Sequence, residues 1–213
     1  MDEQVQAYLK PKTATSLSFR VGPLHRLDRQ TSGLVTFSCT LQGAQIFSLA
    51  LQERRLRKRY LGIFEGKIDA EEYWEDTLYR AEDQKITHLQ PIGEGPGKAA
   101  LTRVFPLASN HTLSLGLVEI GTGRTHQIRV QAASRKHPLL GDLKYGGQKL
   151  SGGFLLHAYE LNTEKAPELK LKENVLAPLP DLFLNRAEQH FGKEIASILR
   201  RGLPTPALQN AIL

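Results

Sequence analysis

The chain holds a single cysteine, Cys39, among its 213 residues. One thiol can form neither an internal disulfide framework nor a cysteine-based zinc cluster, which excludes the small disulfide-rich and zinc-ribbon classes. No apolar run approaches the roughly 20 residues that span a bilayer. The first residues, MDEQVQAYLKPKT, lack the pattern of a signal peptide. We therefore expect a soluble cytoplasmic protein with no membrane partner.

The usual cofactor motifs are also missing. The sequence has no dinucleotide fingerprint and no phosphate-binding loop, because the turn Gly121-Thr122-Gly123 lacks the required spacing and the Lys-Ser/Thr pair. Ser32 does not stand in the Gly-x-Ser-x-Gly context of a hydrolase nucleophile. The histidines and acids nearest one another lack the spacing of metal ligands on a helix. We expect neither a metal nor a cofactor.

What is present is an ordinary globular composition with a basic excess. Hydrophobic residues make up 40% and charged residues 23%, and 28 lysines and arginines face 22 acids, for a net charge of +6. An excess of this size favours a polyanionic partner such as nucleic acid. The length suits one or at most two domains. Since no linker or repeat interrupts the chain, we predict a single domain over residues 1–213, with residues 203–213 as a loose tail.

Hydrophobic periodicity predicts an α+β fold, in which short strands and hairpins are interrupted by helices. The acidic segment 68–82 cannot be assigned. Residues 91–100 read as a loop, and Cys39 reads as a small core residue within a strand. Strands are predicted over residues 34–39, 59–64, 101–106 and 112–120 and within 152–161; helices are predicted over 41–55 and 124–134, with one or two more over 179–202.

A first candidate site is the stretch HRLDRQTSGL, in which Asp28 stands among His25, Arg26 and Arg29. Nearby cations favour the charged form of a carboxylate. Asp28 is therefore expected to be ionised at neutral pH, which suits a nucleophile and not a general acid. A surface ion pair is the competing interpretation, and the stretch taken alone favours it.

A second candidate follows the Gly-Thr-Gly turn. A helix over residues 124–134 would put Thr125 and Arg129 on one face, with Arg124 at the turn. Because Arg129 stands among apolar neighbours, we expect it to point at a partly buried acid. A solvent-facing arginine on an amphipathic helix is the alternative.

A third candidate is the basic run ERRLRKRY, which includes Arg54, Arg55, Arg57 and Lys58 and ends at Tyr60. Cations that bind phosphates, beside an aromatic ring on which a base can stack, suit single-stranded nucleic acid. A solvated charge run next to a half-buried strand tyrosine is the alternative.

Together and in this order, the three pieces resemble the RluA-type pseudouridine synthases. HRLDRQTSGL is similar to that family's signature around its catalytic aspartate, KRYLG to its tyrosine strand, and GTGRTHQIRVQAASRKHPLLGDLKYGG followed by LHAYEL to its third motif. The resemblance covers residues 22–192. It implies a mixed, mainly antiparallel bent sheet flanked by helices, and an isomerase that needs no cofactor.

The resemblance also implies roles for individual residues. Asp28 would be the nucleophile, Arg129 would pair with it, and Tyr60 would stack on the target base. Arg26 would fill the gap that the flipped nucleotide leaves in the RNA. The turn and the basic run would contact the RNA backbone, which assigns Arg124, Arg55, Arg57 and Lys58 to RNA binding.

Other features leave alternatives open. The family's earlier strand with an Asn-Lys-Pro stretch has only Lys10-Pro11 as a counterpart here, so the sheet is expected to lack its first strand if the chain is a fragment of a longer protein. We expect structured RNA, above all large-subunit ribosomal RNA, as substrate, and a monomer. Transfer RNA is the alternative substrate. A non-catalytic RNA-binding protein and a phosphate-binding hydrolase are the readings from other functional classes.

Overall fold

The structure, a computed structural model, describes residues 2–9, 19–81, 86–90 and 97–203. Within these residues, eight strands form one mixed sheet in the order β10-β9-β4-β8-β7-β5-β6, and β2 pairs with β9 beside this path. Only the β2–β9 pairing is parallel among the ladders of this described sheet. The strands are β2 (Ser32–Gly33), β4 (Arg57–Glu65), β5 (Glu72–Ala81), β6 (Ile86–Gln90), β7 (Lys98–Ser109), β8 (Leu113–Ile120), β9 (Leu156–Asn162) and β10 (Asn174–Leu176). The predicted α+β class with a mainly antiparallel sheet is confirmed.

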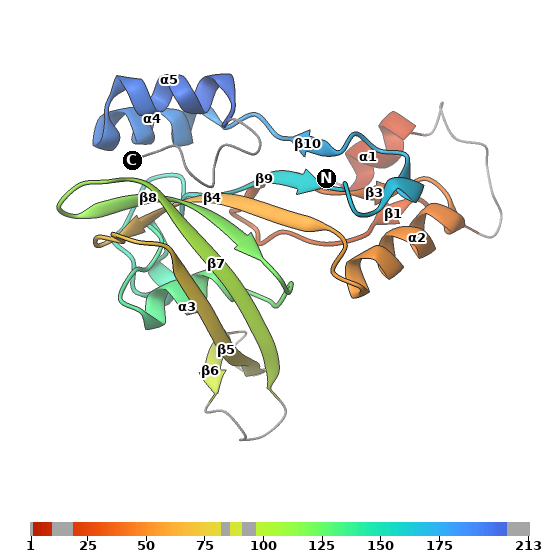
Figure 1. The fold of residues 1–213 in the computed structure, drawn as a ribbon, viewed down its shortest axis with the longest axis horizontal. Helices are drawn as coiled ribbons and strands as arrows, with labels where there is room; N and C mark the ends of the chain where they lie inside the picture. The colour runs from red at the N-terminus through yellow and green to blue at the C-terminus, as the bar shows by residue number, and fades with distance from the viewer. Residues whose placement is uncertain (1, 10–18, 82–85, 91–96, 204–213) are drawn as a thin grey trace.

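Helices cover both faces of the sheet because its central strands are apolar on both sides (Figure 1). In β4, Leu61 and Ile63 face the helices α4 (Asp181–Phe191) and α5 (Lys193–Arg201). Phe64 faces the other way, toward α3 (Gln127–Ser134). The one or two helices predicted over 179–202 are therefore present as α4 and α5. The opposite face of the sheet is covered by α3.

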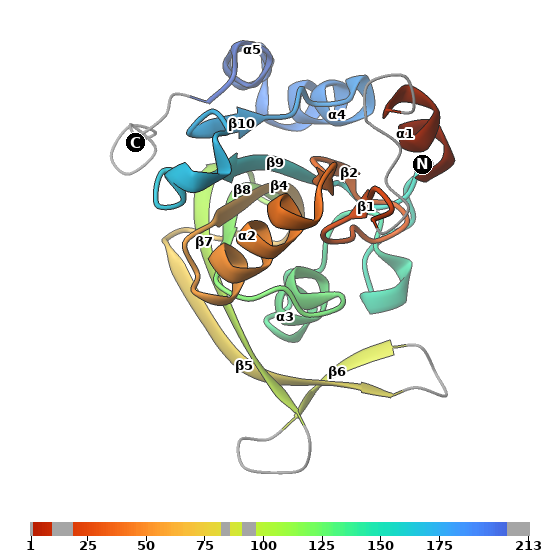
Figure 2. The same ribbon diagram turned by 90° about the vertical axis from the view of Figure 1, so that its right-hand side faces the viewer.

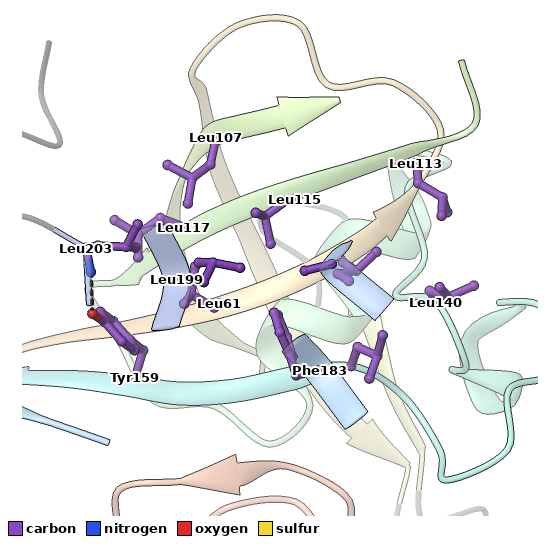
Figure 3. Close-up of a cluster of buried hydrophobic side chains, with 13 residues drawn as sticks. Leu61, Leu107, Leu113, Leu115, Leu117, Leu140, Tyr159, Phe183, Leu199 and Leu203 are labelled. Carbon is purple, nitrogen blue, oxygen red and sulfur yellow. Dashed lines mark hydrogen bonds between the residues drawn. The ribbon is translucent and has the colours of Figure 1, made fainter. Parts of the chain in front are cut away.

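The core on the α4–α5 side includes the last described residue. Leu203 is 4% exposed, and its N–H donates to the hydroxyl of Tyr159 at 2.8 Å, as Figure 3 shows. The prediction of a loose tail from residue 203 is therefore wrong at its first position, because this leucine is anchored in the core. The other residues of that predicted tail, 204–213, lie outside the described part of the chain.

Strands β5, β6 and β7 extend away from the rest of the sheet as an arm (Figure 2). The segment 68–82 that the sequence left unassigned contributes β5, whose Trp74 and Leu78 are buried. The predicted loop 91–100 is wrong at its end, because β7 already begins at Lys98. Residues 91–96 lie outside the described part of the chain.

Several other predicted boundaries shift. Residues 34–39 are not one strand: β3 (Phe37–Ser38) pairs with β1 (Gly22–Pro23), and Cys39 beyond it is exposed and not a core residue. The helix predicted over 41–55 is α2 (Leu41–Gln52), which begins at the N-cap Thr40. A short helix α1 (Asp2–Leu9) and the 3₁₀ turns η1 (Leu143–Tyr145) and η2 (Pro167–Leu169) complete the described elements. None of the described helices combines the length and the apolarity needed to cross a membrane.

Candidate active site

A cavity of ≈ 570 Å³ lies where the loop before β2, the end of α2, strand β4 and the turn before α3 meet. Its volume falls within the range of roughly 300–1,000 Å³ that is usual for ligand sites. The cavity is lined by Asp28, Tyr60 and Arg129, which the sequence places far apart. The fold therefore brings the three predicted catalytic residues to one site.

The loop of Asp28 is held against β9. The N–H of Thr31 donates to the Asp28 carbonyl at 3.0 Å and closes a turn. Ser32 Oγ lies 2.8 Å from His157 Nδ1 on β9. Gly33 adopts a φ of +108°, and a Cβ there would lie 2.2 Å from the Ala158 carbonyl oxygen. Only glycine fits this approach, so the Thr-Ser-Gly segment is the anchor that fixes Asp28 beside the sheet.

Arg129 joins two carboxylates. Its Nη1 donates to Asp28 Oδ2 at 3.0 Å, and its Nε and Nη2 donate to the two oxygens of Asp142 at 2.7 and 2.8 Å. Burial acts to lower the pKa of Arg129, but the hydrogen bonds and charges of the two acids outweigh it and the pKa is raised. The expectation that Arg129 meets a partly buried acid holds, with one refinement. Arg129 itself is 6% exposed, and Asp142, which the sequence did not single out as its partner, is 1% exposed.

The cations next to Asp28 in the sequence are not its partners in the fold. In the described part of the chain, its ion pair is with Arg129, and His126 Nε2 lies 3.9 Å from its carboxylate. His25 also lines the cavity, and its Nε2 accepts the N–H of Thr36 at 3.0 Å. The charge that stabilises Asp28 therefore comes from 101 residues further along the chain.

His126 is a second residue that the sequence analysis did not assign to the site. The helix predicted from residue 124 begins at Gln127, and His126 is its N-cap in the left-handed region, at φ 54°. Thr125 lies before the helix, so the helix face it was predicted to share with Arg129 does not exist. His126 Nδ1 lies 2.7 Å from the hydroxyl of Tyr145. Burial lowers the pKa of His126. The charge of Asp28 opposes this, and the charge of Arg129 adds to it.

Tyr60 and Lys58 reach the cavity because strand residues alternate between faces. Tyr60 packs beside the core cluster on the α3 side. A register shift between Arg59 and Tyr60 against β9 marks a β-bulge, a feature that often occurs beside active sites and re-aims a side chain. Burial, and then the charge of Asp28, raise the pKa of Tyr60 to about 12, and burial lowers the pKa of Lys58.

The basic run is divided between the cavity and an ion-paired surface. Arg54 and Lys58 line the cavity, as do Arg26 and Arg124. Arg55 pairs with Glu53 and Glu168, and Arg57 pairs with Glu164 at 3.1 Å; neither is among the cavity-lining residues. Their assignment to RNA contacts stays a prediction, and so does that of the cavity-lining cations. No group of histidine, cysteine and acidic residues that could hold a metal ion occurs among residues 2–9, 19–81, 86–90 and 97–203.

The fold is that of a pseudouridylate synthase domain. The solved structure of human RNA pseudouridylate synthase domain containing 1 superposes with a TM-score of 0.66 at 25% identity, over 96% of this chain and 86% of that one. Human RNA pseudouridylate synthase domain containing 4 has a TM-score of 0.65 at 21% identity and supports the fold alone.

The sequence comparisons define the family. A family profile described as RNA pseudouridylate synthase matches residues 2–134. The chain is 33% identical over 170 residues to an RNA pseudouridine synthase of Helicobacter pylori strain J99, covering 75% of this chain and 68% of the relative. It belongs to the RNA pseudouridine synthase family, of the RluA type that its motifs resemble.

Two further relatives are longer than the matched region. An RNA pseudouridine synthase of Bacillus subtilis is 35% identical over 178 residues, which are 81% of this chain and 57% of the relative. The ribosomal large subunit pseudouridine synthase D of Neisseria meningitidis serogroup A is 31% identical over 175 residues, 76% of this chain and 46% of the relative. The chain thus spans about half the length of these two proteins.

Proposed function

We propose that the chain isomerises uridine to pseudouridine in RNA, with Asp28 as the nucleophile. The observation that carries this proposal is the ion pair between Asp28 and Arg129, at 3.0 Å, inside the cavity that Tyr60 also lines. A binding protein has no need of a carboxylate that is paired with a buried arginine inside a cavity. Family membership supports the same activity.

The ion pair leaves Asp28 suited to attack. Its Oδ2 accepts from Arg129, whereas Oδ1 accepts no hydrogen bond from the described residues and has His126 as its neighbour at 3.9 Å. Oδ1 can therefore attack an electrophilic carbon, either C1′ of the ribose or C6 of the uracil. The N1–C1′ bond then breaks, the uracil turns, and C5 bonds to C1′. This covalent route uses only groups of the chain and the nucleotide.

The target base must leave its stack before Asp28 can reach it, at a cost of a few kcal/mol. Tyr60 would stack on the flipped uracil, and the raised pKa of about 12 keeps its hydroxyl protonated at neutral pH. Arg26 is exposed at the cavity mouth, where it would fill the gap left in the RNA. Flipping is cheapest from a loop, which favours a uridine outside a regular duplex.

We assign the substrate to structured RNA, most simply large-subunit ribosomal RNA. The relative from Neisseria meningitidis carries a ribosomal large-subunit name. The net charge of +6, and the cavity-lining cations Lys58 and Arg124, suit phosphate contacts.

The experiment compares pseudouridine maps of ribosomal and transfer RNA from a wild-type strain and from one lacking the gene. The proposal expects one or a few sites to disappear from ribosomal RNA. A site lost only from transfer RNA would overturn the substrate and keep the activity. Unchanged maps in both pools would favour a non-catalytic RNA-binding protein.

A further inference from the structure

His126 lies between the nucleophile and a tyrosine that the family resemblance left without a role. Its backbone is in the left-handed region, at φ 54° and ψ 21°, where residues other than glycine are uncommon. Backbone strain of this kind gathers at functional sites. The strain places the imidazole in the cavity, with Nε2 toward Asp28 and Nδ1 toward Tyr145.

The hydroxyl of Tyr145 fixes which nitrogen of His126 carries the hydrogen. The N–H of Thr87, on strand β6, donates to this oxygen at 3.1 Å, and the Thr87 carbonyl lies 3.2 Å away as an acceptor. A tyrosine has one hydroxyl hydrogen. If that hydrogen goes to the carbonyl, the 2.7 Å contact with His126 must be filled by an Nδ1–H donor. Only this tautomer satisfies all three contacts.

With the hydrogen on Nδ1, the Nε2 atom of the His126 imidazole carries a free lone pair. Nε2 lies 3.9 Å from Asp28 Oδ1, too far for a hydrogen bond, as expected when no proton stands between the two atoms. The side chain is 15% exposed, and its exposed part lies in the cavity. His126 therefore presents a free proton acceptor beside the attacking oxygen.

The position of C5 relative to Asp28 is nearly the same in both possible routes. If Asp28 attacks C1′, the rejoined C5 is bonded to the attacked carbon; if Asp28 attacks C6, C5 is its ring neighbour. In both cases C5 lies one bond from an atom that Asp28 touches. A base must be within hydrogen-bond reach of the proton it removes, or one water away, and His126 Nε2, 3.9 Å from the attacking oxygen, is placed for this in either route.

We propose that His126 is the general base that removes the C5 proton after C5 has bonded to C1′. The inference rests on the proposed function. The C5–H bond breaks, its proton passes to Nε2, and its electron pair becomes the C5–C6 double bond. After attack at C1′, the displaced C6–N1 pair goes to N1, which takes up a proton from water. After attack at C6, the displaced pair leaves with the Asp28 carboxylate, and N1, which kept the pair of the broken N1–C1′ bond, takes up a proton from water. The imidazolium then loses its proton to water in the open cavity.

Tyr60, the other predicted catalytic residue near Asp28, is less suited to this step. Tyr60, with a pKa of about 12, is a neutral phenol and a weak base at neutral pH. The pKa of His126 is lowered by burial first and by the charges of Arg129 and Lys144, against the opposing charges of Asp28 and Asp142. Its imidazole is therefore neutral and able to accept a proton near pH 7.

The test is His126→Gln, with His111→Gln at an exposed position as the matched control. The substrate is total RNA from a strain lacking the gene, grown on ordinary or on 5-deuterated uracil, and the product is pseudouridine by mass spectrometry. General base catalysis contributes about 100-fold or more, so His126→Gln should lose on the order of 100-fold in turnover. The isotope effect at C5 should rise from near unity to a full primary effect, because deprotonation becomes rate-limiting.

A second substrate separates this role from a structural one. RNA from cells fed 5-fluorouracil has no proton at C5, so the reaction stops after C5 has bonded to C1′. His126→Gln should form this rearranged fluorinated nucleotide at the wild-type rate. Tyr145→Phe removes only the hydroxyl that sets the tautomer and should show a smaller loss with the same rise in isotope effect.

Each result separates the inference from the proposed function. If His126→Gln turns over at the wild-type rate, the role of His126 is overturned and the isomerase activity stands. The same holds if the variant is slow but its isotope effect at C5 stays at unity. Equal loss on uridine and on 5-fluorouridine makes His126 a structural residue and likewise overturns the inference. A wild-type chain that forms no pseudouridine in any RNA pool refutes the proposed function, and the inference with it.

Discussion

Arg129 and Asp142 form a two-pronged ion pair, with Nε and Nη2 of the arginine 2.7 and 2.8 Å from the two carboxylate oxygens. Both side chains are almost completely buried. The third nitrogen of the same guanidinium, Nη1, holds Asp28 at 3.0 Å. The orientation of the proposed nucleophile therefore depends on Asp142, a residue with no direct contact to it in the described structure.

This relationship predicts that Arg129→Lys is severely damaging. An ammonium acts as a point charge and cannot hold two carboxylates in a planar fork. Because breaking a buried pair leaves an uncompensated charge, we expect a loss of on the order of 3 kcal/mol in the free energy of unfolding, and loss of activity. Urea denaturation and tritium release from RNA labelled at C5 of uridine measure the two effects.

Arg135→Lys is the matched control for this change. Arg135 caps the same helix and pairs with Asp76 at 2.9 Å, at a more exposed position. Because this pair is less buried than the Arg129–Asp142 pair and does not touch Asp28, the variant should lose less stability than Arg129→Lys and keep its activity. Equal stability for the two lysine variants would show that the buried fork around Arg129 has no special importance.

Tyr60 is predicted to act through its ring. Tyr60→Phe should keep RNA affinity, whereas Tyr60→Ala should lose roughly 1–3 kcal/mol of binding free energy, the usual value of one stacked base. Since the hydroxyl stays protonated up to a pKa of about 12, removing it should not alter the pH dependence of binding near neutrality. Fluorescence titration with single-stranded RNA measures affinity. If phenylalanine proves as harmful as alanine, the hydroxyl and not the ring is the important group.

Stability should fall in mild acid. Burial lowers the pKa of His157, the residue that holds the Asp28 loop through Ser32, from its ordinary value of 6.5. A group with a lowered folded-state pKa leaves stability intact above the unfolded pKa. Below the unfolded pKa, the unfolded chain binds a proton at this histidine and the folded chain does not, so the free energy of unfolding drops as the pH falls. His157→Gln should show a shallower pH dependence below about pH 6.5 than the exposed control His111→Gln. Parallel curves for the two variants would contradict this.

The cavity-lining cations should dominate salt-sensitive RNA binding. Each phosphate neutralised on single-stranded RNA contributes about −0.7 to the slope of log affinity against log salt. Replacing Arg26 and Arg124 by alanine should flatten the slope by about one to two units. The double replacement of Arg55 and Arg57 should change it less, because Glu168 and Glu164 already pair with them. A reversed order of the two effects would place the RNA along the ion-paired face.

Short motifs named three residues that the fold brings together, and the catalytic roles of these residues stay a prediction. Asp28, Tyr60 and Arg129 were all named, and all three line one cavity. The stretch HRLDRQTSGL alone suggested His25, Arg26 and Arg29 as the cations next to Asp28. Sequence neighbours need not be partners in a fold: among the described residues the ion pair of Asp28 is with Arg129, which comes from a distant helix.

Other features depend on packing that periodicity does not encode. Asp142 was visible only as an acid near the end of the third motif, and its burial against Arg129 follows from the fold. The alternation that separates Lys58 from Arg57 follows from strand geometry once β4 is known to begin at Arg57. Strand β5 escaped prediction because an acid interrupts its apolar face: Asp76 stands between the buried Trp74 and Leu78, and its charge is paired by Arg135 only in the fold.

The central claim is tested most directly by Asp28→Asn. The amide keeps the size of the side chain and removes its negative charge and its nucleophilicity. Tritium release from total RNA labelled at C5 of uridine, isolated from a strain lacking the gene, measures turnover, and filter binding of the same RNA measures affinity. The account predicts RNA binding close to wild type, with pseudouridine formation reduced to background. Turnover within about tenfold of wild type would contradict it, since a lost nucleophile must cost far more than that.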